Sequence, residues 1–133
     1  NELAPWYNTR AMDVVSLYRE EILDHYQNPR NFGRIDHAHA YARQTNPLCG
    51  DDISVWLKFD RTGKIVQANF EGKGCAICLA AASMLTEYAM SKPKSKLTKF
   101  SENDMLTLLE IEVSETRKKC ALLSLAVLKD CLK

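Results

Sequence analysis

The sequence predicts an α+β fold in which a small antiparallel β-sheet carries α-helices packed on one face. Apolar residues alternate along two segments that flank a polar turn, as expected of a β-hairpin, and helical spacing of apolar residues occurs before and after them. One helix, then strands, then a run of helices is the segregated order typical of this fold class. The 133 residues, 46% of them hydrophobic, are sufficient for one globular domain.

The N-terminal part divides into a lead-in and a helix. Residues 1–12 show no apolar period, so we expect a flexible lead-in, followed by a single domain over residues 13–133. Asp13 is a suitable N-cap, and apolar side chains then recur at helical spacing. Asn28 and Pro29 predict the end of this helix.

The segment that follows residue 52 predicts a β-hairpin. The inward positions of its two strands are Ile53, Val55, Leu57 and Phe59, and then Val66, Ala68 and Phe70. Residues 60–63, which end in a glycine, supply the turn. A short additional strand is expected near residues 41–44.

Helices are predicted for most of the remaining chain. Residues 75–91 are rich in Ala, Leu and Met and contain no helix breaker, which predicts a buried helix. The lysine-rich run over residues 92–99 is interpreted as a solvated linker. Ser101 and Asp104 have the spacing of a helix cap before a short apolar helix, and helical periodicity resumes after Ser114.

Charge and hydropathy exclude several function classes. Lys and Arg number 18 against 17 Asp and Glu, and the net charge of +1 does not predict binding to nucleic acid or to an anionic membrane. No apolar run is long enough to span a membrane, and no signal-peptide pattern is present, so we expect a cytoplasmic protein. The five cysteines are an odd number and do not form a closed set of disulfides. In a reducing compartment, clustered cysteines typically bind metal or take part in catalysis.

Three cysteines lie at the predicted boundaries of strands and helices. Cys49 and Asp51 flank a glycine, whose flexibility lets both anionic side chains converge on one cation. Cys75 opens the long helix, where the helix dipole favours a thiolate. Cys120 follows three cations, residues 117–119, which we expect to favour its ionisation. Three sulfurs and one oxygen form a tetrahedral set that zinc or an iron-sulfur cluster can use.

The other candidate ligands have simpler interpretations. Free cysteine is among the most buried residue types, so Cys78 and Cys131 are interpreted as core residues, although Cys78 stands at the C-x-x-C spacing of a redox pair. His25 falls on the apolar face of the first helix and is expected to pack there. His37 and His39 lie in a loop, and the four-ligand set leaves no position for them.

Four motifs follow one another along the chain. They are the run Asp24–Asn31, the run Asn46–Asp51, Gly74-Cys75 followed by Ala82–Glu87, and the run Arg117–Cys120. Together they strongly resemble the U-type iron-sulfur scaffold family, which comprises IscU, SufU and the N-terminal domain of NifU. The likeness extends from Leu17 to the C-terminus. It implies an α+β fold with a small antiparallel sheet and helices on one side, in agreement with the fold inferred from periodicity.

The resemblance also implies a site and a function. Cys49, Cys75 and Cys120 would accept sulfur and hold a transient [2Fe-2S] cluster or a zinc ion, with Asp51 as the fourth and weakest ligand. The implied partners are a pyridoxal-phosphate cysteine desulfurase, which donates persulfide sulfur, and apo iron-sulfur acceptor proteins, which receive the cluster. The preferred interpretation is a scaffold that carries clusters and is not an enzyme.

Two departures from the family leave a second function open. The IscU branch has a histidine before the third cysteine and a Leu-Pro-Pro-Val-Lys motif for the Hsp70 chaperone system, whereas this chain has Lys119 and, over residues 113–117, Val-Ser-Glu-Thr-Arg. Recognition by that chaperone system is therefore not expected. The basic residue resembles the SufU branch, but the insertion usual in SufU is missing. The alternative is a SufU-like zinc-dependent sulfurtransferase that relays persulfide sulfur, which is an enzyme rather than a carrier.

Overall fold

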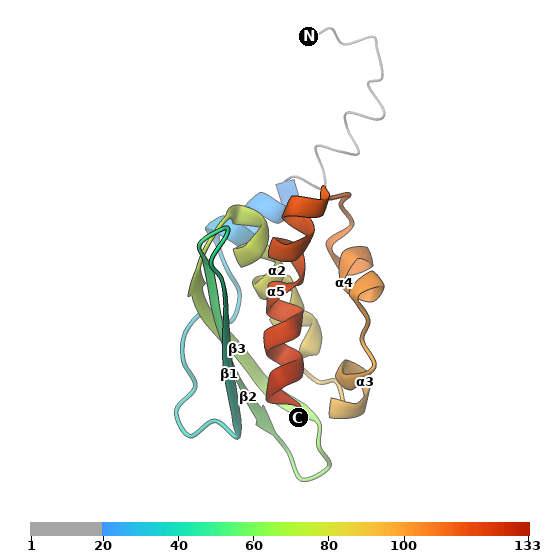
Figure 1. The fold of residues 1–133 in the computed structure, drawn as a ribbon. Coiled ribbons are helices and arrows are strands. Elements are labelled where there is room, and N and C mark those ends of the chain that lie inside the picture. The colour runs from blue at the N-terminus through green and yellow to red at the C-terminus, as the bar shows by residue number, and fades with distance from the viewer. Residues whose placement is uncertain (1–19) are drawn as a thin grey trace, which may run out of the picture.

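One antiparallel sheet and the helices on one of its faces form the two layers of the structure (Figure 1). This computed structural model describes residues 20–133. The strands, in their spatial order, are β1 (Ala40–Asn46), β2 (Asp51–Phe59) and β3 (Ile65–Lys73). The predicted α+β fold is confirmed, as are the hairpin and the additional strand. The predicted lead-in over residues 1–12 and the predicted N-cap Asp13 lie outside the described residues.

Strand β2 is central and supplies much of the core. Its first residues alternate between buried and half-buried positions, and Ile53, Val55 and Leu57 are at most 1% exposed. Helices α2 (Ala76–Ala89) and α5 (Glu115–Cys131) pack against each other and against the sheet. The alternation predicted for this strand is therefore confirmed, because one face of β2 meets helices and the other does not.

The hairpin turn corrects the predicted second strand at one position. Asp60 Oδ1 accepts hydrogen bonds from the backbone N–H groups of Thr62 (2.9 Å) and Lys64 (3.0 Å), which fixes the turn. The register then shifts by one residue beside Lys58 and Phe59, as in a β-bulge. Ile65 is therefore fully buried, whereas Val66, which alternation places inside, is 51% exposed.

The helices begin and end close to the predicted positions. Residues 20–27 are helical and the helix stops before Pro29, as predicted. Helix α4 (Glu102–Leu109) begins with a complete capping box, because the Ser101 side chain accepts from the Asp104 N–H while the Asp104 carboxylate accepts from the Ser101 N–H. This cap was predicted from spacing alone.

The lysine-rich segment is not the solvated linker that the sequence predicted. It contains the short helix α3 (Lys94–Thr98), whose Leu97 is fully buried. Its start is tied to the hairpin, since the Lys94 N–H donates to the Gly63 carbonyl at 3.0 Å. The Lys94 ammonium also lies 4.8 Å from the centre of the Phe59 ring. One apolar side chain among lysines was too weak a signal to predict this docking.

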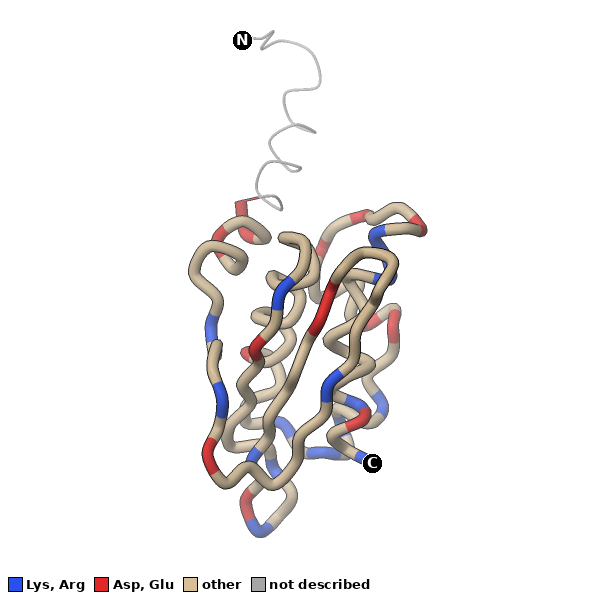
Figure 2. Tube along the Cα trace, turned by 60° about the vertical axis from the view of Figure 1, so that its left-hand side comes forward, with Lys and Arg blue, Asp and Glu red and all other residues tan. Residues whose placement is uncertain are grey.

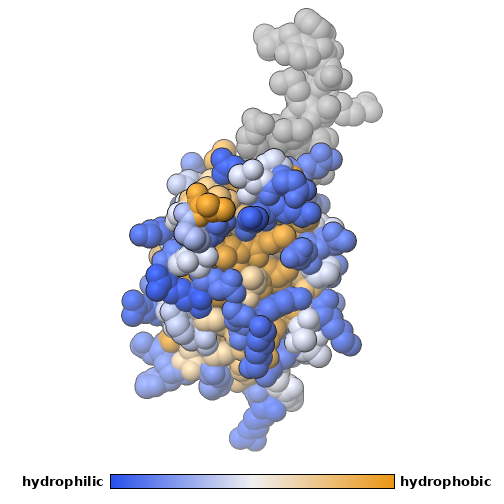
Figure 3. Space-filling model, viewed as in Figure 1, coloured by the Kyte–Doolittle hydropathy of each residue, from blue (hydrophilic) through white to orange (hydrophobic). Residues whose placement is uncertain are grey.

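Charged side chains of both signs are distributed over the described chain. Lys and Arg are interspersed with Asp and Glu over the trace (Figure 2), in keeping with the net charge of +1 of the whole sequence. On the face seen in Figure 3, polar and charged side chains surround a stretch of apolar surface. None of the described helices is both long enough and apolar enough to cross a membrane.

Replacing Leu97 with alanine tests whether α3 is part of the core. We expect Leu97→Ala to lower the free energy of unfolding by about 2–5 kcal/mol, because it leaves a cavity under the helix. Urea unfolding monitored by circular dichroism measures the change, with the exposed neighbour Ser95→Ala as the control. A loss below about 0.5 kcal/mol, typical of surface changes, would mean that the segment is a solvated linker after all.

Candidate metal centre

Three of the four predicted site residues come together where β1 turns into β2. The sulfurs of Cys49 and Cys120 and a carboxylate oxygen of Asp51 all lie within 4.8 Å of one another. Cys49 lies in the turn before β2, Asp51 is the first residue of β2, and Cys120 lies in the first turns of α5. Gly50 has a φ of 72°, a left-handed conformation that glycine adopts without strain, so the chain can bend between the two ligating positions.

Asp51 is the least compensated group of the site. Its side chain is buried, with 1% of the residue exposed. Oδ1 accepts a hydrogen bond from the Cys75 N–H at 3.2 Å, but Oδ2 has no hydrogen-bond partner among the residues that the structure describes. A buried carboxylate oxygen without a partner is costly, and a cation removes that cost. The carboxylate is therefore suited to bind a metal ion.

Cys75 borders this group from the start of α2. It is the N-cap of that helix, is partly exposed, and makes no cap hydrogen bond with its side chain. Its sulfur is not one of the ligand atoms that lie within 4.8 Å of one another. It is nevertheless close enough to Cys120 to influence the pKa of that thiol. The four-ligand set predicted from the sequence is therefore assembled only in part, with Cys75 beside the three residues whose ligand atoms converge.

The ionisation of Cys120 is disfavoured, contrary to the prediction that the cations next to it in sequence would favour it. Burial raises its pKa well above the usual value for a cysteine, and contacts with Asp51 and Cys49 raise it further. Arg117 and Lys119 point to solvent and are exposed, so their charges are screened and do not offset the burial. Cys120 therefore needs a bound cation to lose its proton.

The donor set fits a soft or borderline metal. Thiolates and one carboxylate are donors that zinc accepts, and the same donors can hold the irons of a small cluster. Gly74 makes room for the carboxylate, because a Cβ at that position would lie 3.1 Å from the Asp51 Cγ and closer still to Oδ1. This close approach was not predicted, since the sequence shows the glycine but not what lies against it.

The remaining cysteines and the loop histidines lie outside this group. Cys78 is fully buried and Cys131 is 7% exposed, as predicted for core residues. Burial raises the pKa of Cys78 well above its usual range and that of Cys131 to about 12. His39 Nδ1 accepts a hydrogen bond from the Phe59 N–H at 3.0 Å, far along β2 from Asp51.

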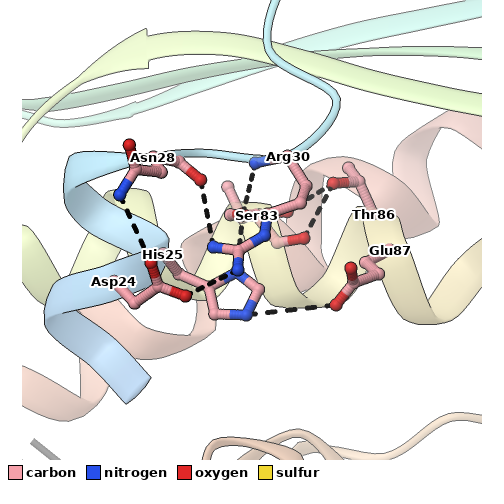
Figure 4. Close-up of polar contacts among 8 residues, drawn as sticks. Asp24, His25, Asn28, Arg30, Ser83, Thr86 and Glu87 are labelled. Atoms are coloured by element: carbon pink, nitrogen blue, oxygen red, sulfur yellow. Dashed lines mark hydrogen bonds and ion pairs between the residues drawn. The ribbon is translucent and has the colours of Figure 1, made fainter. Parts of the chain in front are cut away.

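A polar network that is buried at His25 and Ser83 and exposed at Asp24 and Arg30 explains the first of the four motifs (Figure 4). His25 is 5% exposed, as expected of a packed histidine, and its Nδ1 lies 2.8 Å from Ser83 Oγ on α2. The Arg30 backbone N–H also donates to Ser83 Oγ. The Arg30 guanidinium donates to the Asp24 carboxylate and to the Asn28 carbonyl. The motif thus ties the loop after the first helix to α2. Ser83 belongs to the third motif, but its contacts with His25 and Arg30 were not predicted. A serine within an apolar helix could have indicated a buried polar contact.

Comparison with known proteins gives consistent matches. The sequence model described as "NifU-like N terminal domain" matches residues 17–133. The zinc-dependent sulfurtransferase SufU of Bacillus subtilis is 39% identical over 84% of this chain and 86% of its own length. The iron-sulfur cluster assembly enzyme IscU of Drosophila melanogaster is 31% identical over 89% of this chain and 77% of its own.

The fold also matches solved structures. The crystal structure of a candidate iron-sulfur cluster assembly scaffold protein for the SUF system, from Fervidobacterium islandicum AW-1, superimposes with a TM-score of 0.76. That match has 29% sequence identity and covers 86% of this chain and 95% of the other. Both the sheet and its helices are therefore shared with a protein of this class.

Adding a methyl group at Gly74 tests the contact with the carboxylate. We expect Gly74→Ala to push the Asp51 side chain away from the sulfurs and to weaken cobalt(II) affinity by about 10–100-fold, the range seen when metal-ligand support is disturbed. Visible absorption during a cobalt titration measures the affinity, and the exposed neighbour Lys73→Ala is the control. Equal affinities in all three proteins would show that the carboxylate position does not matter for metal binding.

The buried histidine predicts a pH dependence of stability. Burial lowers the pKa of His25 below its ordinary 6.5, so the unfolded chain binds the proton more tightly than the folded one. The stability that neutral, buried His25 contributes to the fold is fully present above pH 6.5 and is lost as the pH falls below this value. We expect the free energy of unfolding to fall between about pH 6.5 and 5, and to fall less in His25→Gln than in the exposed control His37→Gln. Identical slopes would contradict this assignment.

Proposed function

The chain belongs to the NifU-like N-terminal domain family, and from this we propose that it is a scaffold on which iron-sulfur clusters are assembled. It accepts sulfur from a cysteine desulfurase, binds iron, and builds a transient [2Fe-2S] cluster. Cys49, Asp51, Cys75 and Cys120 hold the cluster, which then passes to apo acceptor proteins. The cluster is cargo in this account, not a resident cofactor.

The observation that supports this proposal most directly is the uncompensated Asp51 carboxylate between two thiols. Oδ2 lacks a hydrogen-bond partner among the described residues, and the sulfurs of Cys49 and Cys120 lie within 4.8 Å of the carboxylate. If all three groups are anionic at once, they are stable together only around a cation. A site that exists to carry iron has a physical reason to bury such a set.

The difference in exposure between the ligands suits loading and release. Cys49 is exposed in its turn and Cys75 is partly exposed, so an incoming persulfide can reach both sulfurs. Asp51 and Cys120 are buried behind them. The oxygen of Asp51 is a harder donor than sulfur and binds iron less strongly than a thiolate does. The ligand set therefore combines sulfurs that a donor can reach with one weak metal–oxygen bond. Both properties suit a cluster that is loaded and later transferred.

A zinc-dependent sulfurtransferase is the second candidate function. It is favoured by the 39% identical SufU of Bacillus subtilis and by Lys119, which stands where the IscU branch has histidine. In this case the same four residues would hold zinc, which would stabilise the ligating sulfurs as thiolates at neutral pH. The exposed Cys49 would then leave the metal to accept sulfur from the desulfurase, while Asp51 and Cys120 retained it.

Cluster assembly in vitro distinguishes the two functions. The protein is incubated without oxygen with a cysteine desulfurase, cysteine and ferrous iron, and cluster formation is followed by visible absorption. We expect a cluster chromophore that is lost in Cys75→Ser and kept in Cys131→Ser, because Cys131 lies in the core and donates only to the Val55 carbonyl. Tightly bound zinc, no chromophore and faster desulfurase turnover would favour the sulfurtransferase instead.

The proposed weak oxygen ligand leads to a separate prediction. If Asp51 makes the cluster labile, Asp51→Ala slows transfer to an apo ferredoxin by about tenfold, at the low end of the 10–100-fold effects that changes around a metal produce. Circular dichroism in the visible range follows the transfer. The adjacent Asp52→Ala is the matched control, because Asp52 pairs with Arg43 at 2.7 Å and not with the site. Unchanged transfer rates in Asp51→Ala would reject this role.

A further inference from the structure

Cys75 and Cys78 form a C-x-x-C pair at the start of α2, directly after β3. Cys75 is the N-cap and Cys78 is the third helical residue, one turn further on. Side chains at this spacing within a helix lie about 5–6 Å apart at Cβ, and Cys75 adjoins the helix as its extended N-cap. A disulfide requires about 3.5–4.5 Å at Cβ, so a small adjustment of the first turn would let the two sulfurs bond. The Cys75 side chain makes no cap hydrogen bond, so no contact with the backbone of the first turn holds it away from Cys78.

The two cysteines differ in accessibility. Cys75 is partly exposed, whereas Cys78 is fully buried. A sulfur donor can therefore reach Cys75, and the thiol of Cys78 can be approached only from within the protein. C-x-x-C redox pairs at helix N-termini have the same two roles. The exposed cysteine reacts with the partner molecule, and the shielded cysteine reacts only with its neighbour.

Cys78 is also a thiol near the candidate metal centre to which the proposed function assigns no role. The converging ligand atoms belong to Cys49, Asp51 and Cys120. Burial raises the pKa of the Cys78 thiol, and the nearby Asp51, Cys75 and Cys49 raise it further, so Cys78 lies near the centre. Cys131 provides the contrast, because it lies near the end of α5 and contacts the Val55 carbonyl of the sheet.

We propose that Cys78 is a resolving thiol that converts a persulfide on Cys75 into free sulfide. The Cys78 sulfur attacks the inner sulfur of the Cys75 persulfide and forms a Cys75–Cys78 disulfide, and the terminal sulfur leaves as hydrogen sulfide. The inference rests on the proposed function, in which a site cysteine, here Cys75, accepts sulfur from a desulfurase.

The step balances without a further reactant. The Cys78 S–H bond and the persulfide S–S bond break, while the disulfide bond and an S–H bond of hydrogen sulfide form. The terminal persulfide sulfur gains two electrons, and the two cysteine sulfurs lose them. A thiol reductant must reopen the disulfide before the next cycle. Cluster assembly consumes sulfide while a desulfurase delivers sulfur at a higher oxidation level, so this reduction would occur beside the site that holds the iron.

Sulfide release from a preloaded chain tests the proposal. The reduced full-length protein is loaded by a cysteine desulfurase and cysteine without iron, and is then separated from both by gel filtration. Intact mass spectrometry of Cys78→Ala, which lacks the resolving thiol, first records the gain of one sulfur atom, which tests the proposed function. With no reductant present, we expect the wild-type chain to release about one sulfide per loaded chain, trapped with monobromobimane, and to acquire a disulfide. Peptide mapping should place that disulfide between Cys75 and Cys78.

Matched variants separate a resolving role from a structural one. Cys78→Ala should take up sulfur and retain it, with sulfide release reduced at least about tenfold, whereas Cys131→Ala should release it as the wild type does. Equal release by Cys78→Ala, or a disulfide from Cys75 to Cys49 or Cys120, would overturn the inference and leave sulfur acceptance intact. A Cys78→Ala chain that gains no sulfur, together with a loaded wild type that forms no disulfide, would overturn the proposed function and the inference with it.

Mild oxidation of the unloaded wild-type protein with diamide gives a readout that does not depend on any variant folding. We expect peptide mapping to find the Cys75–Cys78 disulfide as the main product, because this pair needs only a local adjustment of one helical turn. Failure to form it under conditions that oxidise Cys49 or Cys120 would contradict the proposed geometry.

Discussion

A buried carboxylate with one oxygen left unpaired is the constraint on which this end of the fold depends. Asp51 is nearly inaccessible to solvent, yet among the described residues only the Cys75 N–H donates a hydrogen bond to it. Leaving the other oxygen unsatisfied is costly unless a cation binds there. The thiols of Cys49 and Cys120 beside it, one of them strongly disfavoured as a thiolate without a cation, impose the same requirement. Both requirements support the proposal that this site binds a metal ion.

The sheet and its helices bring these groups together from distant parts of the chain. The antiparallel register pairs Asp52 with Lys73, so the start of β2 lies beside the end of β3. Because α2 begins directly after β3, its N-cap Cys75 is placed against Asp51, and α5 adds Cys120 from the layer above. The core that fixes these elements is rigid and apolar, while the turn that carries Cys49 is exposed. The fold therefore holds Asp51 and Cys120 within its core and leaves Cys49 accessible to solvent.

The sequence predicted those features that depend on local chemistry. Alternation along β2 and the Ser101 capping box were readable because each depends on residues close together in the chain. Predictions failed where contacts are distant. The bulge reversed the face of Val66, and Leu97 inserts into a core contributed by other segments. Cys120 is buried, so cations adjacent in sequence do not control its pKa. The close approach of Gly74 to the Asp51 carboxylate could not be predicted either, because the two residues lie far apart in the sequence.

Zinc X-ray absorption spectroscopy of the metal-loaded protein tests the account most directly. Three sulfurs and one oxygen around a single ion should give a shell of sulfur at about 2.3 Å and one oxygen at about 2.0 Å. Replacing the carboxylate of Asp51 by the methyl of alanine should remove or exchange only the oxygen contribution. A shell made entirely of nitrogen and oxygen, or of four sulfurs with no oxygen, would contradict the claim that these cysteines and this aspartate share one ion.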